Sequence, residues 1–439
     1  MAGGVGPPSA GGPPRYQWAA GSTGVPDWDA LVVGAGPAGS TAARNLAATG
    51  HRVLLLEEHA KIGVPVQCAG LVSRRVLALA GEGSYVIQPV RGATVFGPSL
   101  RPFSFRADEP RAFVIDRGAL DVHLADRAAA AGAVVRTAVR FDGIVRREPD
   151  GVRVRLTGAD GRPEELSARV IVGADGVASA VARAARLRRP VEILPAFEAE
   201  FPEAPGDPDT VEVYLGRTFA PGLFGWWIPD GHGGARVGLA ADADGTSARA
   251  YFGRLLSHLE RRFGRALANP TAYLVSGIPI GTVPSLSADR VVLVGDAAAQ
   301  VKPLSGGGIF TGIRAAELAG GVVAEALDAN DLSAARLRRY DAAWHAEFSE
   351  EFRKALYLRR LFVRLTDAEL DSVVEALGHG SLGGTVVAFG DIDFPTSVAR
   401  ELLRESPGLV RLFPKAVGAW LSTRGDYPAP AVEPGPRRA

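Results

Sequence analysis

The sequence predicts a mixed α/β fold, with a parallel sheet, a separate antiparallel sheet and a C-terminal helical region. Short apolar runs at 30–33 and 53–56 flank a glycine-rich turn and an alanine-rich segment, as buried parallel strands flank a crossover helix. Residues 195–280 instead alternate in polarity and carry many aromatic residues, which is typical of an antiparallel sheet packed over an apolar space. After residue 309 the pattern is helical to about residue 424.

The composition of the chain limits the classes of function that are possible. The chain has 439 residues, enough for two or three domains, and a formal net charge of +1, which gives no support for nucleic-acid binding. Its single cysteine, Cys68, excludes an internal disulfide and a cysteine-based metal site, so we expect no metal and a cytoplasmic location. No run reaches the ~18 apolar residues that span a bilayer. Any membrane contact is therefore expected to be peripheral.

The elements follow in order along the chain. A helix over 40–49, stopped by Gly50, connects the first two strands. A helix over 118–131 precedes a strand at 134–137, and a two-stranded ribbon is expected at 143–147 and 152–156 around a Pro-Asp-Gly turn. Two more core strands are expected at 170–172 and 291–294.

These elements suggest a discontinuous domain organisation. We expect a nucleotide-binding domain built from 27–85, 110–190 and 276–330, and an antiparallel-sheet substrate domain built from 86–109 and 191–275. A C-terminal helical region covers 331–424. The Gly/Pro-rich segment 1–26, which lacks a signal-peptide pattern, and the tail 425–439 are expected to be disordered.

The first motif is the glycine-rich turn from Gly34 through Gly36 and Ala38 to Gly39, which lies between a strand and a helix. In a Rossmann-like unit, such glycines allow a tight turn, close approach of the backbone to a pyrophosphate, and packing of helix on strand. Glu57 ends the second strand at about the distance expected of the acid that binds the ribose. The alternative is an ordinary βα turn.

Two further blocks each place an aspartate after a buried strand. Asp175 follows the strand at 170–172, where the alternative is a simple Asp-Gly turn. Asp296 follows the strand at 291–294, and its carboxylate can accept a hydrogen bond from a sugar or ribityl hydroxyl. The segment from Pro303 through Gly306, Gly307 and Gly308 to Ile309 then lets the backbone approach a flat ring, unless it is only a flexible hinge.

Together, the order of the three blocks resembles FAD-dependent oxidoreductases of the p-hydroxybenzoate hydroxylase type. The resemblance extends from residue 29 to about 320 and implies that the Asp-Gly and Gly-Asp blocks serve FAD. Arg117 matches the R-x-x-[FL]-D segment of that superfamily, whose arginine contacts FAD. The alternative for Arg117 is a surface residue near a helix start.

Two segments are similar to the geranylgeranyl reductase family, which saturates isoprenoid double bonds. Residues 62–73 resemble the loop IGxPVxCxxxxS, and 224–229 resemble the substrate motif Y-x-W-x-F-P, with Phe for Tyr and Ile for Phe. The resemblance implies that Cys68, Ala69, Leu71 and Val139 contact FAD. It implies that the substrate contacts Phe224, Trp226, Trp227 and Pro229. The alternative for the two tryptophans is core packing.

The function implied is hydride transfer from reduced FAD to a carbon–carbon double bond of a prenyl chain, with Cys68, Trp226 and Phe224 as catalytic candidates. The aromatic faces can stabilise developing positive charge, whereas Cys68 is either a backbone contact to FAD or a reactive thiol. His232 and Tyr214 lie in the right domain to supply a proton, but neither is singled out. The electron donor is left open between NADPH, a ferredoxin and another reduced cofactor, because the chain has no second GxGxxG motif.

Three other functions are to be compared with these motifs. A flavin monooxygenase that hydroxylates an aromatic or other apolar small molecule shares every FAD motif. A non-enzymatic electron relay would not need the aromatic-rich second sheet. A flavin-dependent halogenase shares a W-x-W-x-I-P-like segment but needs a lysine between the nucleotide-binding region and that segment, and the chain has no lysine between Lys61 and Lys302.

Overall fold

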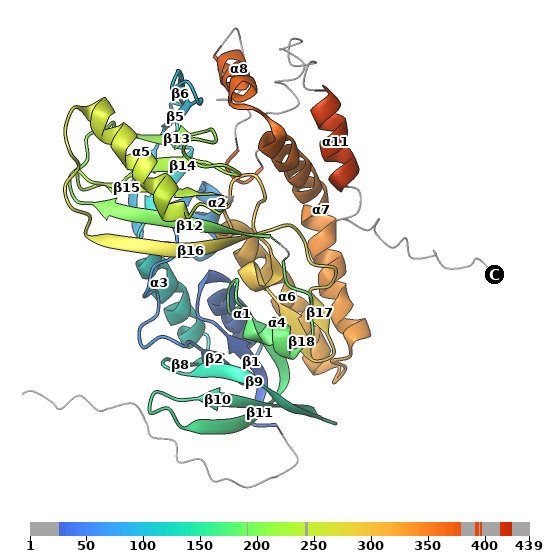
Figure 1. The fold of residues 1–439 in the computed structure, drawn as a ribbon. Coiled ribbons are helices and arrows are strands. Elements are labelled where there is room, and N and C mark those ends of the chain that lie inside the picture. The colour runs from blue at the N-terminus through green and yellow to red at the C-terminus, as the bar shows by residue number, and fades with distance from the viewer. Residues whose placement is uncertain are drawn as a thin grey trace, which may run out of the picture.

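The computed structural model describes residues 26–190, 192–241, 245–378, 391–394, 396 and 413–423. The segments predicted to be disordered, 1–26 and 425–439, lie outside these residues except for Pro26, which is buried. Two large sheets dominate the fold (Figure 1), and a column of C-terminal helices runs along one side of both. The mixed α/β fold class predicted from the sequence is confirmed.

The first sheet has eight strands, and its central part is parallel. The strands follow the order β17-β18-β11-β1-β2-β8, and β1, β2, β8, β11 and β18 are parallel to their neighbours among these five. Their bounds are β1 Trp28–Val33, β2 Val53–Leu56, β8 Val134–Arg136, β11 Pro163–Gly173, β17 Ser287–Ala288 and β18 Val291–Leu293. The apolar runs at 30–33 and 53–56 are fully or almost fully buried, as strands covered on both faces must be.

The predicted ribbon extends this sheet. β9 (Arg140–Glu148) and β10 (Gly151–Thr157) pair antiparallel around the expected turn, and β10 also pairs with the first half of β11. The ribbon is therefore a three-stranded extension, because β11 is longer than the core strand that the sequence indicated.

Helices cover the faces of this sheet. α1 (Pro37–Ala48) packs against α3 (Arg117–Ala130) and α6 (Ile309–Asp328), and the short α4 (Ala180–Ala184) packs on β9 and β11. α1 begins three residues before the predicted start because Pro37 takes the first helical position, where its missing N–H costs nothing. α3 begins after Asp116, whose side chain accepts a hydrogen bond from Ala119 N.

The second sheet has seven strands in the order β16-β12-β15-β14-β13-β5-β6. Every neighbouring pair is antiparallel except β5 and β13. The bounds are β5 Gly92–Phe96, β6 Pro102–Arg106, β12 Glu192–Phe201, β13 Thr210–Tyr214, β14 Gly225–Pro229, β15 Ala235–Ala240 and β16 Ala272–Ile280. Helix α5 (Ala248–Phe263) covers one face with a buried core that includes Tyr214 and Trp227.

A small sheet joins the two large ones. β3 (Leu71–Val72) and β4 (Val86–Val90) both pair with β7 (Ala112–Ile115), and α2 (Arg74–Ala80) lies between β3 and β4 in the chain. The segment 86–109, assigned to the substrate domain, thus gives β5 and β6 to the seven-stranded sheet and β4 to this small sheet. β16 also runs past residue 276 into the segment assigned to the nucleotide-binding domain. The domain boundaries stay a proposal.

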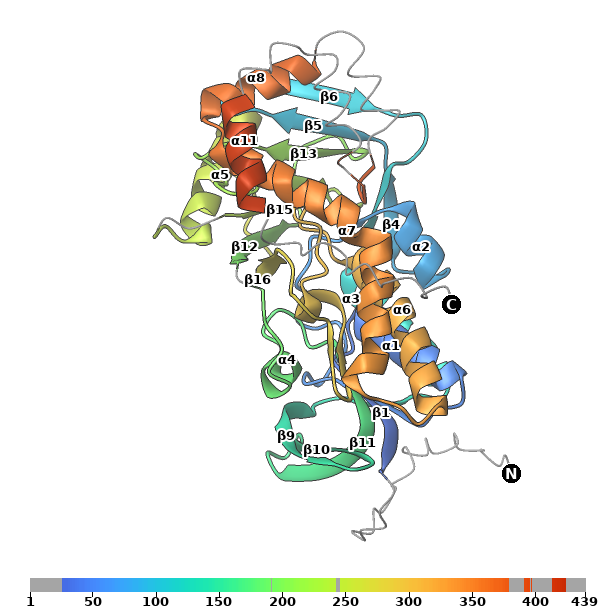
Figure 2. The same cartoon turned by 90° about the vertical axis from the view of Figure 1, so that its right-hand side faces the viewer.

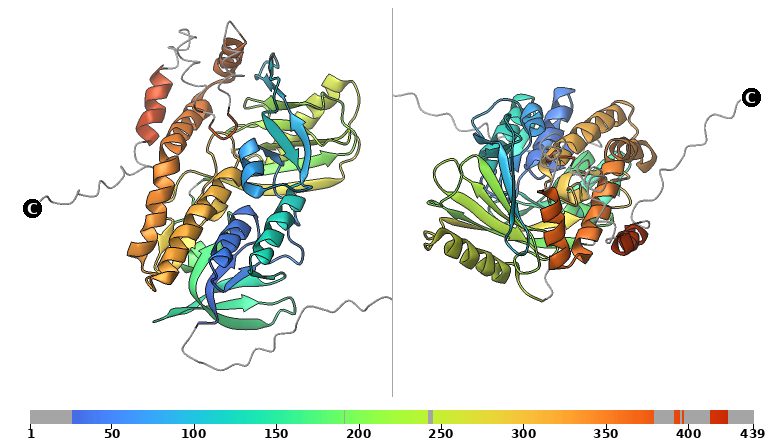
Figure 3. Two further views of the ribbon diagram at one scale, coloured as in Figure 1. Left: turned by 180° about the vertical axis from the view of Figure 1, so that it is seen from behind. Right: turned by 90° about the horizontal axis from the view of Figure 1, so that it is seen from above.

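Within the described residues, the C-terminal helices are α7 (Ala334–Arg364), α8 (Asp367–Leu377) and α11 (Phe413–Thr423). α7 packs on α6 and β17 through a buried aromatic stripe that includes Trp344, Phe348 and Phe352. The side view (Figure 2) shows α7 running past both large sheets, with α11 against its upper part. Seen from behind (Figure 3), α6 and α7 lie side by side.

Candidate active site

A cavity of about 980 Å³ lies between the two large sheets. Residues that follow β1, β2, β11 and β18 line it, because the carboxyl ends of parallel strands open onto the same edge of a sheet. All the residues predicted to bind the cofactor line it except Gly39 and Pro303. Of the predicted substrate contacts, Phe224 and Trp226 line it, whereas Trp227 and Pro229 are not among the described lining residues.

The glycine-rich turn is shaped by two close backbone approaches. Gly34 has φ +101°, and a Cβ there would lie 2.4 Å from the carbonyl oxygen of Ala174. A Cβ on Gly39 would lie 1.8 Å from the carbonyl oxygen of Gly34, so Gly39 acts in packing rather than at the cavity wall. Gly36 has only the Arg117 guanidinium near its missing Cβ, at 3.8 Å. The N-terminus of α1 is thereby left open to an anion.

Glu57 faces this turn from the end of β2. Its Oε2 accepts a hydrogen bond from Ala35 N at 3.0 Å, and its Oε1 accepts one from His59 N at 3.0 Å. The ring Nδ1 of His59 lies 2.6 Å from the same Oε1. The carboxylate therefore lies beside the glycine-rich turn, where a ribose ligand is expected.

Arg117 is held in place from its own helix. Its guanidinium donates two hydrogen bonds to Asp121, at 2.9 and 3.1 Å, one turn along α3. Burial works to lower the pKa of Arg117, but the nearby Asp121 and Cys68 outweigh it and raise the pKa. Arg117 is thus a fixed positive charge between the glycine-rich turn and the loop that carries Cys68. The Sγ of Cys68 accepts a weak hydrogen bond from Gly70 N at 3.4 Å.

The two predicted aspartates differ in their surroundings. Asp175 accepts hydrogen bonds from Ser179 Oγ at 2.7 Å, Ala180 N at 2.7 Å and Val181 N at 3.0 Å, so it holds the start of α4. Asp296 accepts no hydrogen bond from any described residue, and burial raises the pKa of its carboxyl group. A half-buried acceptor without a hydrogen-bond donor among the described residues is expected to meet a donor on a ligand.

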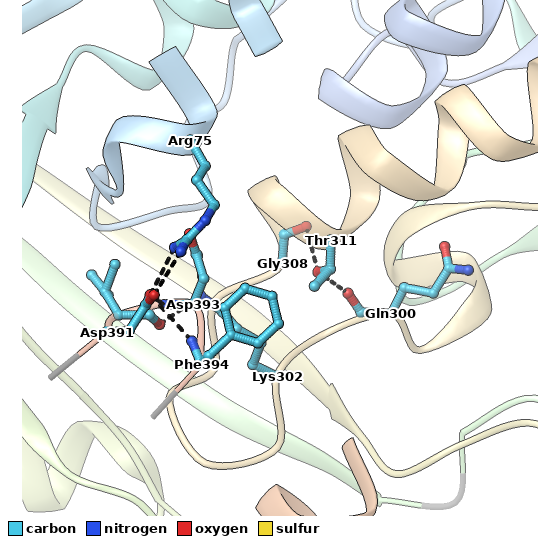
Figure 4. Close-up of polar contacts among 9 residues, drawn as sticks. Arg75, Gln300, Lys302, Gly308, Thr311, Asp391, Asp393 and Phe394 are labelled. Atoms are coloured by element: carbon cyan, nitrogen blue, oxygen red, sulfur yellow. Dashed lines mark hydrogen bonds and ion pairs between the residues drawn. The ribbon is translucent and has the colours of Figure 1, made fainter. Parts of the chain in front are cut away.

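Lys302 and a distant C-terminal segment flank the triple-glycine loop (Figure 4), and sequence reasoning did not find this cluster. The buried Lys302 Nζ donates to Asp393 Oδ1 and to the carbonyl oxygen of Ile392, both at 2.8 Å. Arg75 of α2 donates to Asp391 at 2.9 Å. The lysine and Asp393 are 91 positions apart, and no local motif joins them. The only sign of this cluster in the sequence was that Lys302 is one of few lysines in a chain whose basic residues are mostly arginine.

The other end of the cavity is apolar and belongs to the second sheet. Phe224 and Trp226 lie edge to face with ring centroids 6.3 Å apart. Trp227 faces the opposite side of β14, where it is 1% exposed in the core beneath α5. Trp227 therefore packs in the core, as the alternative interpretation expected, and its position does not support a contact with the substrate.

The two earlier candidates for a proton donor are placed away from the cavity. Tyr214 is buried under α5, donates to Glu212, and has a pKa raised by burial. His232 lies in an exposed turn after β14, where its N–H donates to Asp230. Neither is among the described residues that line the cavity.

Comparison with known proteins identifies the family. A family model described as an FAD binding domain matches residues 27–348. A digeranylgeranylglycerophospholipid reductase of Methanopyrus kandleri is 33% identical over 397 residues, which cover 88% of this chain and 98% of the relative. The chain belongs to the geranylgeranyl reductase family of FAD-dependent flavoproteins.

Two further members show the extent of the match to the geranylgeranyl reductase family. A digeranylgeranylglycerophospholipid reductase of Methanothermobacter thermautotrophicus is 35% identical, covering 80% of this chain and 91% of the relative. A crystal structure of a geranylgeranyl bacteriochlorophyll reductase-like protein from Thermoplasma acidophilum matches with a TM-score of 0.78 and 25% identity, covering 89% of this chain and 99% of that one. The predicted family is confirmed, and the chain is an FAD-dependent oxidoreductase.

The residues present fit the cofactor of a geranylgeranyl reductase. The open α1 N-terminus suits a pyrophosphate, and the unpartnered carboxylate of Asp296 suits a hydroxyl donor. We propose that the glycine-rich turn, Glu57, Arg117 and Asp296 hold FAD. In the described residues, no group of three or more His, Cys, Asp or Glu side chains could bind a metal ion. Within the same residues, no helix is long and apolar enough to cross a membrane.

Glu57→Ala is expected to weaken FAD binding by roughly 1.5–3 kcal/mol, or about 10- to 150-fold, because a charge-assisted hydrogen bond to the ribose is lost. The fold should be retained when FAD is in excess. Fluorescence titration of the apoprotein with FAD measures the affinity, and Glu82→Ala, at an exposed position that is not among the described cavity residues, is the matched control. An unchanged FAD affinity in Glu57→Ala would show that Glu57 is not the ribose ligand.

Proposed function

We propose that this protein reduces carbon–carbon double bonds in the geranylgeranyl chains of a glycerolipid. The observation that carries the proposal is the composition of the cavity, which joins the FAD cradle to an apolar wall containing Phe224 and Trp226. A flavoprotein that only relayed electrons would not need such a wall. The curated relatives named as digeranylgeranylglycerophospholipid reductases support the same substrate class.

The chemistry divides between the cofactor and the chain. Reduced FAD supplies two electrons and one hydrogen as a hydride equivalent. The protein's own residues hold the prenyl chain, exclude water and supply the second hydrogen as a proton. Phe224 and Trp226 present aromatic faces and edges where positive charge develops on an unpolarised alkene, and such faces stabilise a cation.

The donor and the membrane contact belong to the same proposal. The donor is NADPH, a ferredoxin or another reduced cofactor, and a chemical reductant tests the reaction without choosing among them. A substrate of this class resides in a bilayer, so we propose peripheral contact with a membrane surface. Co-sedimentation with vesicles made of the substrate lipid measures that contact.

The decisive assay uses the FAD-loaded protein, a geranylgeranyl glycerolipid and dithionite without oxygen. Mass spectrometry is expected to show the addition of H2 for each double bond reduced, with heat-inactivated protein as the control. A product that appears only with oxygen and gains an oxygen atom would identify a monooxygenase and overturn the proposal.

A further inference from the structure

We propose that Glu198 is the acid that delivers the proton to the double bond, an assignment that rests on the proposed reduction of a prenyl chain. Glu198 lies on β12, on the inner face of the seven-stranded sheet, and its side chain lines the cavity. Neither the glycine-rich blocks nor the aromatic motif contains this residue. Its position beside the aromatic wall follows from the register of three neighbouring strands.

Trp226, Gly238 and Glu198 form one row across β14, β15 and β12. Trp226 pairs with Gly238, and Gly238 pairs with Glu198. The missing side chain at Gly238 leaves the space for the indole ring: a Cβ there would lie 2.6 Å from Trp226 Cζ2 and 2.9 Å from Glu198 Cβ. The indole therefore lies over Gly238, and its Nε1 donates to Glu198 Oε2 at 2.6 Å.

This hydrogen bond determines which oxygen can carry a proton. Oε2 accepts from the indole N–H, so in the neutral acid the proton belongs on Oε1. Oε1 is buried and has no hydrogen-bond partner among the described residues. A buried polar atom without a protein partner that belongs to a cavity-lining side chain is suited to donate to a bound substrate.

Three other carboxyl groups at the cavity are engaged by cations. Arg117 holds Asp121 by two hydrogen bonds, Arg262 holds Glu212, and Lys302 holds Asp393. Among the described residues Glu198 has no such ion pair, and it is only 4% exposed. Its place next to the aromatic wall brings it close to where the prenyl chain is proposed to lie.

The protonation state of Glu198 at neutral pH suits a proton donor. Burial raises the pKa of Glu198 to about 7, although the Trp226 hydrogen bond and the positive charge of Arg236 on β15 act to lower it. Glu200, two residues along β12, acts to raise it. Because an effective general acid has a pKa near the working pH, a substantial fraction of Glu198 is protonated at neutral pH and able to donate.

In the proposed reaction, proton transfer from Glu198 precedes hydride transfer. The Glu198 Oε1–H bond breaks, and the proton forms a C–H bond with one alkene carbon by taking up the π electron pair. The other carbon becomes electron-deficient and receives the hydride equivalent from reduced FAD, so that H2 is added overall. The Glu198 carboxylate regains a proton from water before the next turnover.

The experiment compares Glu198→Gln with Glu200→Gln in the FAD-loaded protein. Glu200 lies on the same face of the same strand but forms an ion pair with Arg236 and is not among the described cavity residues. Glu198→Gln should retain FAD, melting temperature and flavin reduction by dithionite. Its lipid reduction should fall by about 100-fold or more, the usual contribution of a general acid. Glu200→Gln should keep turnover within about threefold of the wild type.

The pH profile gives a second readout that a structural role would not change. Wild-type turnover should fall as pH rises through about 7, because the protonated form is required. Glu198→Gln should lose this limb, and Glu198→Asp should retain it at a reduced rate. Trp226→Phe removes a hydrogen bond that lowers the pKa of Glu198, so the limb should move to higher pH.

Infrared titration of the FAD-loaded protein without substrate gives a readout independent of turnover. A protonated carboxyl band that titrates near pH 7 should be present in the wild type and absent from Glu198→Gln. If turnover and its pH dependence are unchanged in Glu198→Gln, the role of Glu198 is overturned and the proposed lipid reduction still stands. A wild type that reduces no lipid, with its FAD bound and reducible, would overturn the proposed function and this role with it. If Glu198→Gln fails to fold, the Glu198→Asp variant decides. Turnover of Glu198→Asp that does not fall as pH rises would refute the assignment of Glu198 as the proton donor.

Discussion

Trp226→Ala is expected to remove most of the lipid reduction while leaving FAD content unchanged. The side chain lines the apolar end of the cavity and belongs to none of the FAD blocks. Its loss deletes a large apolar wall and leaves Glu198 without its N–H donor. We expect kcat/KM to fall by roughly 30- to 100-fold, the equivalent of the few kcal/mol that burial of a large side chain contributes. Part of the loss should appear in kcat, because an interaction with developing charge strengthens only in the transition state.

The neighbouring Trp227→Ala is the matched control. It is the same residue type on the same strand, but it faces the core beneath α5 and is 1% exposed. Its removal should destabilise the fold by about 3–5 kcal/mol through the cavity that it leaves. Flavin occupancy, melting temperature and turnover should be measured on one preparation of each variant. A Trp226→Ala protein that loses FAD and thermal stability in proportion to activity would make Trp226 a core residue as well.

Asp296→Asn is expected to weaken FAD binding and yet stabilise the apoprotein. A half-buried carboxylate that accepts no hydrogen bond from the described residues is unfavourable until a ligand donor reaches it, although the charge of Arg117 partly offsets this. Asparagine removes the charge from this site, but it also replaces a charge-assisted hydrogen bond to FAD. We expect the affinity to fall by about 1.5–3 kcal/mol, or roughly 10- to 150-fold, measured by titration of the apoprotein with FAD.

The gain in apoprotein stability should depend on pH. Burial raises the pKa of Asp296, so the folded apoprotein holds this proton more tightly than the unfolded chain, whose aspartate has its ordinary value of 3.8. The wild type therefore loses stability as pH rises from about 3.8 through the raised pKa. The difference in melting temperature between Asp296→Asn and the wild type should be absent below that window and complete above it.

Asp175→Asn is the control for this prediction. Asp175 also follows a parallel strand and lines the cavity, but three hydrogen bonds engage its carboxylate at the start of α4. Its replacement should destabilise the apoprotein. If Asp296→Asn were also destabilising without FAD, the Asp296 carboxylate would have a structural partner, and its assignment to FAD would be wrong.

The nucleotide-binding half of the fold was predictable because its signals are local. The strands at 30–33 and 53–56, the glycine-rich turn and the helix after it are specified by residues that are adjacent in sequence. The parallel arrangement then requires Glu57, Asp175 and Asp296 to meet at one edge, because each follows a strand of the same sheet. Their common position at the cavity followed from this rule. Their individual roles toward FAD stay predictions.

The substrate half was predictable only as a type of sheet. Aromatic content and alternation indicated an antiparallel sheet, but two adjacent tryptophans necessarily point to opposite faces, and sequence does not say which face is inside. The parallel pairing of β5 with β13 joins segments more than a hundred residues apart. The link between Lys302 and Asp393 likewise joins residues 91 positions apart, and no local motif records it.

The sequence by itself therefore determined the family, the cofactor and the edge of the sheet at which the FAD blocks meet, since these depend on contiguous motifs and on the geometry of parallel strands. Only the tertiary structure decided that Trp226 rather than Trp227 faces the cavity, and that Glu198 lies beside it. The physical reason is register: a shift of one residue moves every side chain of a strand to the other face, and the pairing of β12, β15 and β14 is set by contacts between distant segments.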